Sequence, residues 1–147
     1  MTQADQTVNY RATLEAYIRA WATNDKALLL SIFDDGCILE DPVGTPAFSG
    51  HDGLSRFWDF AHQDTGRQLT PALEEIRINA DQGVMRFVMQ VRDEAKKAGM
   101  NLSIIEHIAF APDGRIRHLR AFWDETNVSI PEGLAPLLPD IEDAYQQ

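Results

Sequence analysis

The hydrophobic positions in the first part of the chain recur with the 3.6-residue period of an α-helix. The apolar face of the first such segment contains Tyr17 and Trp21, and the second segment begins after a capping Asn24 or Asp25. A short strand of alternating polarity, about residues 37–43, separates the second segment from the third. The helices are predicted over about residues 7–22, 26–33 and 51–63, and Asp34-Asp35-Gly36 is expected to end the second.

From residue 68 onward the pattern changes to the period of two that is typical of β-strands. In the second of these segments, Met85, Phe87 and other apolar residues alternate with more polar neighbours. The sequence Pro112-Asp113-Gly114 predicts a hairpin turn between the last two strands. Strands are predicted over about residues 68–80, 83–93, 100–110 and 115–128. Helices followed by an antiparallel meander are typical of α+β folds, so we expect a single α+β domain over residues 1–147.

The charge of the chain excludes two classes of partner. Thirteen Lys and Arg residues against 23 Asp and Glu give a formal net charge of −10, whereas nucleic acids and anionic membrane surfaces bind basic patches. The N-terminal residues are polar and acidic, and no segment approaches the ~18 apolar residues of a membrane span, so we expect a cytoplasmic protein. Residues 131–147 contain four acids and no Lys or Arg, which predicts an acidic C-terminal tail at the surface.

Several common kinds of site have no counterpart in the sequence. The single cysteine, Cys37, excludes an internal disulfide and a cysteine metal cage. The four histidines, His51, His62, His107 and His118, do not have the spacing of metal ligands, so no metal site is expected. The chain also contains neither a nucleophile-elbow serine nor a glycine-rich dinucleotide motif.

Three polar residues fall on predicted apolar faces: Tyr17 in the first helix, Asp41 in the short strand and Glu106 in the third strand of the meander. Each also has a structural interpretation. Tyr17 can be a core tyrosine whose hydroxyl reaches water or a carbonyl. Asp41 can form a turn before a proline through its side chain. Glu106 would be a surface residue if the strand register were shifted. A buried carboxyl without a charged partner takes up a proton instead of staying ionised, which makes Glu106 a functional candidate.

Together these residues have the chemistry needed to abstract a proton next to a carbonyl group. An ionised Asp41 removes a weakly acidic proton, while the Tyr17 phenol and a neutral Glu106 carboxylic acid donate hydrogen bonds to the enolate oxygen. The neutral acid is necessary in this scheme, because a charged carboxylate cannot donate. The sequence therefore predicts an acid–base site built from Asp41, Tyr17 and Glu106.

At these residues the sequence resembles the bacterial ketosteroid isomerases (steroid delta-isomerases) of the SnoaL-like, nuclear-transport-factor-2-like superfamily, in which a neutral acid in the oxyanion hole is the established example of this chemistry. The resemblance covers about residues 8–130 and is most specific at Glu40-Asp41-Pro42-Val43-Gly44, in register with the upstream Tyr17. The other matching residues are Asn24-Asp25, Ile32-Phe33, Asp34-Asp35, Ser49-Gly50, Ile105-Glu106-His107, Arg120-Ala121-Phe122-Trp123 and Asn127. The middle strands match only in pattern.

This resemblance implies both a fold and a set of roles. The fold is a cone-shaped α+β barrel, in which a strongly curved, mostly antiparallel sheet wraps around the N-terminal helices. Asp41 is then the base that shuttles a proton between two carbons of a steroid, Tyr17 is the principal oxyanion donor, and Glu106 is the second donor. Phe57 and Trp123 line the apolar ligand pocket. Members of the family are typically homodimers and use no cofactor, so we expect the same of this chain.

Three residues depart from the family pattern. Glu106 stands in place of Asp and adds one methylene group, which shifts the geometry of a donor that tolerates little misplacement. Trp58 stands where the family has a tyrosine that hydrogen-bonds the catalytic one, and its indole can only donate, from a different point. Phe33 lacks the hydroxyl that some members have there. Phe33 and Trp58, with Met85 and Phe87, are further candidates for contacting the substrate.

Two other functions are compatible with the same pattern. A SnoaL-type polyketide cyclase would use Asp41 as an acid or base in an intramolecular aldol closure. A binding or carrier module would hold a small apolar ligand without chemistry, since fold alone does not decide function. All of these interpretations expect a small apolar ligand, such as a steroid-like or polyketide-like ketone.

Overall fold

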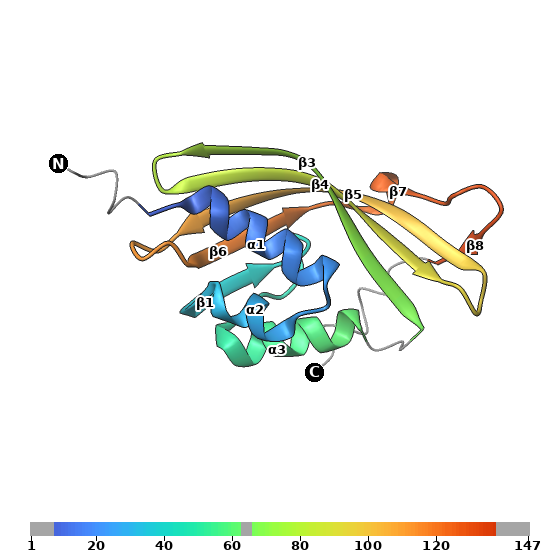
Figure 1. Cartoon of the computed structure of the whole chain (residues 1–147), viewed down its shortest axis with the longest axis horizontal. Helices are drawn as coiled ribbons and strands as arrows, with labels where there is room; N and C mark the ends of the chain where they lie inside the picture. Colours follow the sequence, from blue (N-terminus) through green and yellow to red (C-terminus); the bar gives the residue numbers. More distant parts are fainter. Residues whose placement is uncertain (1–7, 63–65, 138–147) are drawn as a thin grey trace.

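Figure 1 shows the computed structural model of the chain, which describes residues 8–62 and 66–137. Within these residues, three helices lie on the concave side of an eight-stranded sheet (Figure 1). The helices are α1 (Tyr10–Ala22), α2 (Lys26–Ser31) and α3 (Gly50–Ala61). The strands are β1 (Phe33–Glu40), β2 (Phe48–Ser49), β3 (Arg67–Asn79), β4 (Gln82–Asp93), β5 (Ala98–Phe110), β6 (Ile116–Phe122), β7 (Val128–Ser129) and β8 (Ala135–Pro136), and the 3-10 helix η2 (Glu125–Asn127) precedes β7.

The order of the strands joins the two halves of the chain. The path through the sheet is β2-β1-β6-β5-β4-β3, and the short strands β7 and β8 pair with β5. Neighbouring strands are antiparallel except in the β1–β6 and β5–β8 pairs. The parallel β1–β6 pair is possible because the chain runs through α3, β3, β4 and β5 between these two strands, which gives it the long crossover that parallel pairing needs.

The sheet is strongly curved and does not close (Figure 1). Strands β3, β4 and β5 arch over α1, which packs against β3. The register shifts between Leu73 and Glu75 in the β3–β4 pair, and between Ala109 and Phe110 in the β5–β6 pair. Irregularities of this kind bend a strand and increase its twist. The arrangement confirms the predicted α+β class, with a curved sheet around the N-terminal helices.

Local sequence explains where the first two helices begin. The Asn9 side chain accepts a hydrogen bond from Ala12 N, and the Asp25 side chain accepts one from Leu28 N, both at 3.0 Å. Each bond satisfies an N–H group that has no partner within the helix, and Asp25 is therefore the cap of α2. The core lies between the helices and the concave face of the sheet. Its largest fully buried apolar side chains are Phe33, Phe87, Phe110, Leu14, Leu29, Leu39, Leu54, Met85, Ile108, Ile116 and Leu119.

The boundary between the second helix and the first strand differs from the prediction. Helix α2 ends at Ser31 and β1 begins at Phe33, so Asp34-Asp35-Gly36 lies within the strand. Pairing with β6 explains the early start, because Ile116 N donates to the Ile32 carbonyl at 2.8 Å and Phe33 pairs with Ile116. A long-range contact of this kind overrides the local turn signal of the Asp-Asp-Gly sequence.

The last predicted strand is shorter than expected. Strand β6 ends at Phe122, because Asp124 caps the short helix η2. The Asp124 side chain accepts a hydrogen bond from Thr126 N at 2.8 Å, and Asp124 N donates to Asn127 Oδ1 at 2.9 Å. These local side-chain bonds offer the backbone an alternative to the sheet ladder.

The predicted acidic tail falls partly within the described residues. Strand β8 pairs in parallel with Ala98 and Gly99 of β5, and Leu137 packs against the core. Residues 138–147 of the tail lie outside the described residues. In the described part of the chain, no helix has both the length and the apolar character needed to cross a membrane.

Candidate active site

A row of side chains crosses the concave face of the sheet from β1 to β4. At the end of β1, Asp41 lies beside Ala121 of β6, since Val43 N donates to the Ala121 carbonyl at 2.8 Å. Ala121 pairs with Glu106 of β5, and Glu106 pairs with Met85 of β4. Residues opposite each other in a sheet point to the same face. Ala121, Glu106 and Met85 are all fully buried, which identifies this face as the inner one.

Helix α1 brings Tyr17 to this row. The Tyr17 hydroxyl lies 3.2 Å from Oε2 of Glu106, within hydrogen-bond distance, although the two residues are 89 positions apart. The rings of Phe33 and Phe87 flank the Tyr17 ring, with centroids 6.2 and 6.4 Å away. Two of the predicted substrate-contact residues therefore form the apolar surroundings of the Tyr17–Glu106 pair.

Glu106 is a buried carboxyl in a setting that favours its neutral form. Its side chain has no exposed surface, and Oε1 has no hydrogen-bond partner among the described residues. Burial raises the pKa of Glu106 well above its ordinary value, and the charge of Asp41 raises it further, while the bond with Tyr17 lowers it. A carboxyl in this environment keeps its proton near neutral pH and can donate from an oxygen that no other group uses. The prediction that Glu106 is buried is confirmed.

Asp41 differs from Glu106 in its exposure and in the size of its pKa shift. It is partly exposed, and the indole N–H of Trp123 donates to its Oδ1 at 2.7 Å. Burial raises the pKa of Asp41 to about 6, and the Trp123 hydrogen bond opposes this rise. At pH 7 most Asp41 side chains are therefore ionised, as a general base requires. Asp41 and Glu106 thus hold different protonation states at the same pH.

Tyr17 donates its hydroxyl hydrogen to Glu106. Its side chain is 3% exposed, and burial raises its pKa well above 10, with further increases from the charges of Glu106 and Asp41. The phenol therefore keeps its proton throughout the physiological range. A protonated phenol, a neutral acid and an ionised base lie together on one inner surface, which is the set of groups that proton abstraction next to a carbonyl needs.

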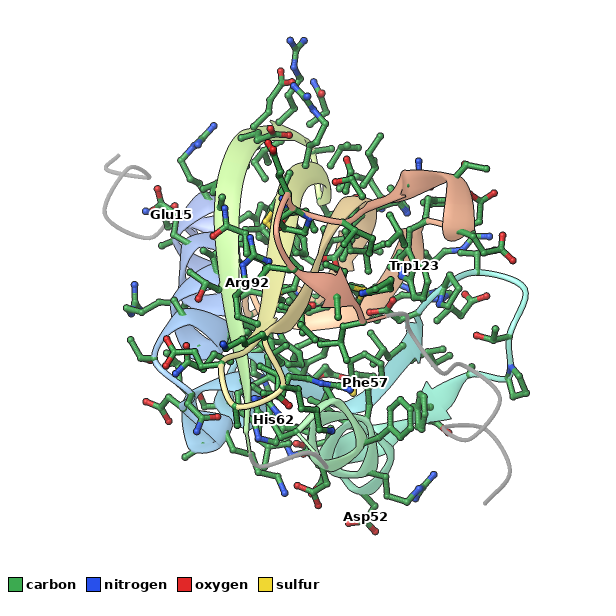
Figure 2. All side chains as sticks on the ribbon, turned by 90° about the vertical axis from the view of Figure 1, so that its right-hand side faces the viewer. Glu15, Asp52, Phe57, His62, Arg92 and Trp123 are labelled. Carbon is green, nitrogen blue, oxygen red and sulfur yellow. The ribbon has the colours of Figure 1, made fainter. Side chains whose placement is uncertain are left out.

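Phe57 and Trp58 of α3 belong to an aromatic cluster around Trp21. The ring centroids of Phe57 and Trp58 lie 6.2 and 4.5 Å from that of Trp21, and Trp58 also stacks on His62 at 4.3 Å. Figure 2 shows Phe57, which lies on this helix, and His62, which caps its C-terminal end. Trp21 lies one helical turn after Tyr17, with a centroid distance of 6.3 Å. The structure thus groups Phe57 and Trp58 with Trp21.

The hydrogen bond from Trp123 to Asp41 has no counterpart in the sequence-based prediction, which places Trp123 only in the pocket wall. A signal for it exists in the sequence, because Trp123 follows Ala121 by two residues and so shares its face of the sheet. Figure 2 shows Trp123 on the sheet side of the molecule. Trp21 could likewise be placed from the sequence but not given a role. The helical period puts it beside Tyr17, and nothing in the pattern indicates a partner for its N–H.

Potential metal ligands do not gather in the described ranges, 8–62 and 66–137, where no three His, Cys, Asp or Glu side chains are arranged to hold an ion. His118 Nε2 lies 2.6 Å from Glu40 Oε2, and His107 Nε2 lies 2.7 Å from Gln82 Oε1. Both contacts join neighbouring strands. These histidines therefore act as hydrogen-bonding partners within the sheet.

Comparison with curated proteins finds a steroid isomerase among the relatives of this chain. This chain is similar to the Steroid Delta-isomerase of Nocardioides simplex, with 26% identity over 113 residues, which cover 77% of this chain and 88% of that protein. In addition, residues 14–119 match the family of the SnoaL-like domain. The matched segment contains Tyr17, Asp41 and Glu106.

Solved structures share the fold. SalBIII, an epoxide hydrolase/cyclase-like enzyme in pyran ring formation in polyether salinomycin, has a TM-score of 0.73 at 16% identity and covers 82% of this chain and 95% of its own. RV0760c from Mycobacterium tuberculosis, in complex with estradiol-17beta-hemisuccinate, has a TM-score of 0.72 at 15% identity and covers 84% and 99%. Since the family match covers more than half of the chain and the architecture agrees with it, this protein belongs to the SnoaL-like domain family.

Proposed function

We propose that this protein is an isomerase that needs no cofactor and moves a C=C bond in a ketosteroid-like, apolar ketone by proton transfer. Conversion of a 5-ene-3-ketosteroid to the conjugated 4-ene-3-ketosteroid is the model reaction. The observation that carries the proposal is Glu106, a fully buried carboxyl with a raised pKa, which contacts Tyr17 and has one oxygen without a partner within residues 8–62 and 66–137. The similarity to a steroid delta-isomerase supports the same reaction class.

The reaction needs two proton transfers by one base. The Asp41 carboxylate removes a proton from the carbon between the carbonyl and the C=C bond, and the electron pair moves onto the ketone oxygen to form a dienolate. Asp41 then returns the same proton to the far carbon of the former double bond, and the ketone re-forms. No atom is gained or lost, and Asp41 ends in its original ionised state, so the chemistry requires no oxidant, reductant or water.

Tyr17 and Glu106 stabilise the dienolate oxygen. Both keep their protons at neutral pH because burial raises their pKa values, so both can donate to the oxygen as its charge develops. Their apolar surroundings strengthen these bonds relative to water, because the effective dielectric constant is lower. Donors that are already in place need no reorganisation during the reaction, which is the main source of catalysis of this kind.

The ligand proposed for this site is apolar and steroid-sized. Aromatic side chains flank the polar groups, and Phe57 and Trp123 are the residues that we expect to line the pocket. RV0760c, which shares the fold, was solved in complex with a steroid ester. A polyketide-like ketone is the alternative substrate, and a cyclase would use the same Asp41 in an aldol closure.

A direct assay tests the proposal. The protein is mixed with a 5-ene-3-ketosteroid, and the absorbance of the conjugated enone is followed for the wild type and for Asp41→Asn. Turnover that is present in the wild type and lost in the variant supports the isomerase. Tight binding of an equilenin-like phenol without turnover would reject the steroid substrate while keeping the site. Neither turnover nor binding would reject the steroid interpretation, and ligand binding that is unaffected by Asp41→Asn and Tyr17→Phe would favour a carrier.

We also propose that the protein is a cytoplasmic homodimer whose subunits each form one domain, and that the outer face of the sheet is the dimer interface. Val84, Ile105 and Phe122 are 44, 46 and 45% exposed on this face, and Ile105 and Phe122 pair across neighbouring strands. A hollow beside them is lined by Glu75, Arg77, Val84, Arg86 and Ile105. A two-fold interface presents the same patch from both subunits, and a patch with charges of both signs around apolar residues can be self-complementary.

Sedimentation of the wild type and of Ile105→Lys tests the interface. We expect a dimer for the wild type and a monomer for the variant, with unchanged thermal stability of the monomer because the side chain is exposed. Ile130→Lys is the matched control, since Ile130 is also partly exposed but lies after β7. Dimers of equal stability in all three proteins would place the interface elsewhere.

A further inference from the structure

A second buried polar group adjoins Tyr17 and has no role in the mechanism above. Trp21 is 4% exposed, and its indole N–H has no hydrogen-bond partner among the described residues. An indole nitrogen can only donate, so this N–H requires an acceptor. Buried polar groups in folded proteins are almost always hydrogen-bonded, and an exception calls for an explanation at the site where it occurs.

The position of Trp21 limits which acceptor it can use. It lies one helical turn after Tyr17 on α1, and the two rings meet edge to face at 6.3 Å with an interplanar angle of 63°. The Trp58 ring packs against the Trp21 ring at a tilt, with centroids 4.5 Å apart, and His62 stacks on it at 5.6 Å, so both contacts restrict its orientation. The other rings around Tyr17 belong to Phe33 and Phe87, which carry no polar atoms. The Trp21 N–H acts on Tyr17, whose hydroxyl oxygen can accept a hydrogen bond.

The two groups already influence each other. The Trp21 N–H lowers the pKa of Tyr17 against the larger effect of burial, although it stops short of hydrogen-bond geometry in this structure. A phenol oxygen can accept while its O–H donates, and a donor on the oxygen strengthens the O–H as a donor. A hydrogen bond from the Trp21 N–H to the Tyr17 oxygen is favourable, because it gives a buried donor an acceptor.

We propose that Trp21 is a positioning residue whose indole N–H donates to the Tyr17 oxygen and thereby directs the single hydroxyl proton of Tyr17 at the ligand. The inference rests on the proposed role of Tyr17 as an oxyanion donor. The Trp58 ring packs against Trp21 with a centroid distance of 4.5 Å, and Trp21 lies one helical turn from the residue that it would position.

The first test uses the indole N–H resonances of the full chain. The three tryptophans produce three signals in a ¹H–¹⁵N spectrum, and Trp21→Phe identifies the signal of Trp21. Tyr17→Phe removes the acceptor and keeps the ring, so the Trp21 indole proton should move upfield, by more than the signals of the other two tryptophans. Tyr10→Phe is the matched control, since Tyr10 lies on the same helix but stacks on Phe110, and it should leave the Trp21 signal in place.

The second test measures coupling. Trp21→Phe should weaken the binding of an equilenin-like phenol by about 3- to 10-fold, the loss of one ordinary hydrogen bond. The same substitution in a Tyr17→Phe background should cause no further loss, because Trp21 acts through the Tyr17 oxygen. A merely structural role would cause equal losses in both backgrounds. Circular dichroism of each variant excludes unfolding as the cause.

These outcomes separate the inference from the proposed function. The role of Trp21 would be overturned if its indole resonance did not move in Tyr17→Phe, or if the losses of phenol affinity were additive in the double variant. Either result would hold whether or not the protein turns over a steroid. A coupled response together with the absence of steroid turnover would keep the Trp21–Tyr17 pair and reject only the substrate. The spectroscopic test needs no ligand, so it remains decisive if the phenol does not bind.

Discussion

The two faces of the sheet place acidic residues in contrasting environments. On the outer face, Glu75 is bonded to Arg77 and Arg86, and the hydrogen bonds from these guanidinium groups lower its pKa. On the inner face, Glu106 has no exposed surface, and burial raises its pKa well above the ordinary value. Glutamate is thus an ion paired with arginines on one face and a buried carboxyl whose neutral form is favoured on the other. Desolvation, and not residue type, decides in which direction the pKa of each glutamate moves.

Glu40 and Asp41 repeat this contrast at adjacent positions. Glu40 lies 2.6 Å from His118 Nε2 and 3.3 Å from Arg120 Nε, whereas Asp41 accepts the indole N–H of Trp123. Successive residues of a strand point to opposite faces, so one of two neighbouring acids enters an ionic network and the other enters the apolar site. A neutral N–H donor orients Asp41 without supplying the positive charge that would make it a weak base.

The largest expected effect separates these two adjacent acids. Asp41→Asn should lower kcat for the 5-ene-3-ketosteroid by about 10²- to 10⁴-fold, the range for loss of a general base. Glu40→Gln should leave kcat essentially unchanged, because Glu40 faces the ionic network. Enone absorbance measures both. Equal losses in the two variants would mean that this segment affects activity through its structure and not through the Asp41 carboxylate.

The next effect concerns the donors to the oxyanion. Glu106→Leu should lower kcat by about 10²- to 10³-fold, since it removes a preorganised donor. Glu106→Gln should stay within about 10-fold of the wild type, because an amide still donates a hydrogen bond. Glu75→Gln on the outer face is the control and should not change kcat. Equal activity of the wild type and both Glu106 variants would show that Glu106 lies off the reaction path.

The dependence of stability on pH should differ between the two faces. The pKa of Glu106 is raised in the folded state. At a pH above the ordinary pKa of glutamate, the unfolded chain therefore binds fewer protons at this residue than the folded chain does. The free energy of unfolding falls as the pH rises through this range. The slope from this one group is about 1.4 kcal/mol per pH unit until its folded pKa is reached. Glu106→Gln should therefore stabilise the protein more at pH 8 than at pH 4, as measured by urea unfolding.

The matched variant on the outer face should behave in the opposite sense. The pKa of Glu75 is lowered in the folded state, so its contribution is present above the ordinary glutamate pKa and is lost as the pH falls. Glu75→Gln should cause a small loss of stability at pH 8 that disappears at low pH. A parallel pH dependence in the Glu75 and Glu106 variants would contradict the contrast between the two faces.

The smallest expected effect is a shift in the pH–rate profile. Activity should rise with pH as Asp41 ionises, with an apparent pKa of about 6 for kcat/KM in the wild type. Trp123→Phe removes a hydrogen bond that lowers the pKa of Asp41, so the acidic limb should move to higher pH. His51→Gln is the control, since His51 lies against the Phe33 carbonyl, and it should leave the limb in place. An unshifted limb in Trp123→Phe would mean that the indole does not tune the base.

Much of the site is predictable because it depends on local periodicity. The alternation of strand residues places Asp41 on the face of Cys37 and Leu39, both buried, and places Glu106 on the face of Ile104 and Ile108. The helical period places Tyr17 on the inner face of α1 in the same way. These assignments need no knowledge of which elements are neighbours, because side-chain direction follows from the backbone alone.

The boundaries of two elements were wrong where long-range pairing or a side-chain cap overrides local pattern. The Asp34-Asp35-Gly36 sequence predicts a stop, but pairing of β1 with β6 draws it into a strand. The continuous strand predicted over about residues 115–128 ends at Phe122, because Asp124 caps a turn of 3-10 helix. The two errors have different causes, since the β1–β6 pairing is a long-range contact, whereas the Asp124 cap is a local side-chain hydrogen bond.

By itself, the sequence determined the fold class, the faces on which Tyr17, Asp41 and Glu106 lie, and the resemblance to the isomerase family. Only the tertiary structure decided that these faces meet. The parallel β1–β6 pair sets Asp41 beside Ala121, α1 carries Tyr17 to 3.2 Å from Glu106, and Trp123 reaches Asp41. Periodicity specifies direction, but distance depends on how a curved sheet packs around its helices. The pKa values of both carboxyls arise from that packing, because burial is a property of the whole fold.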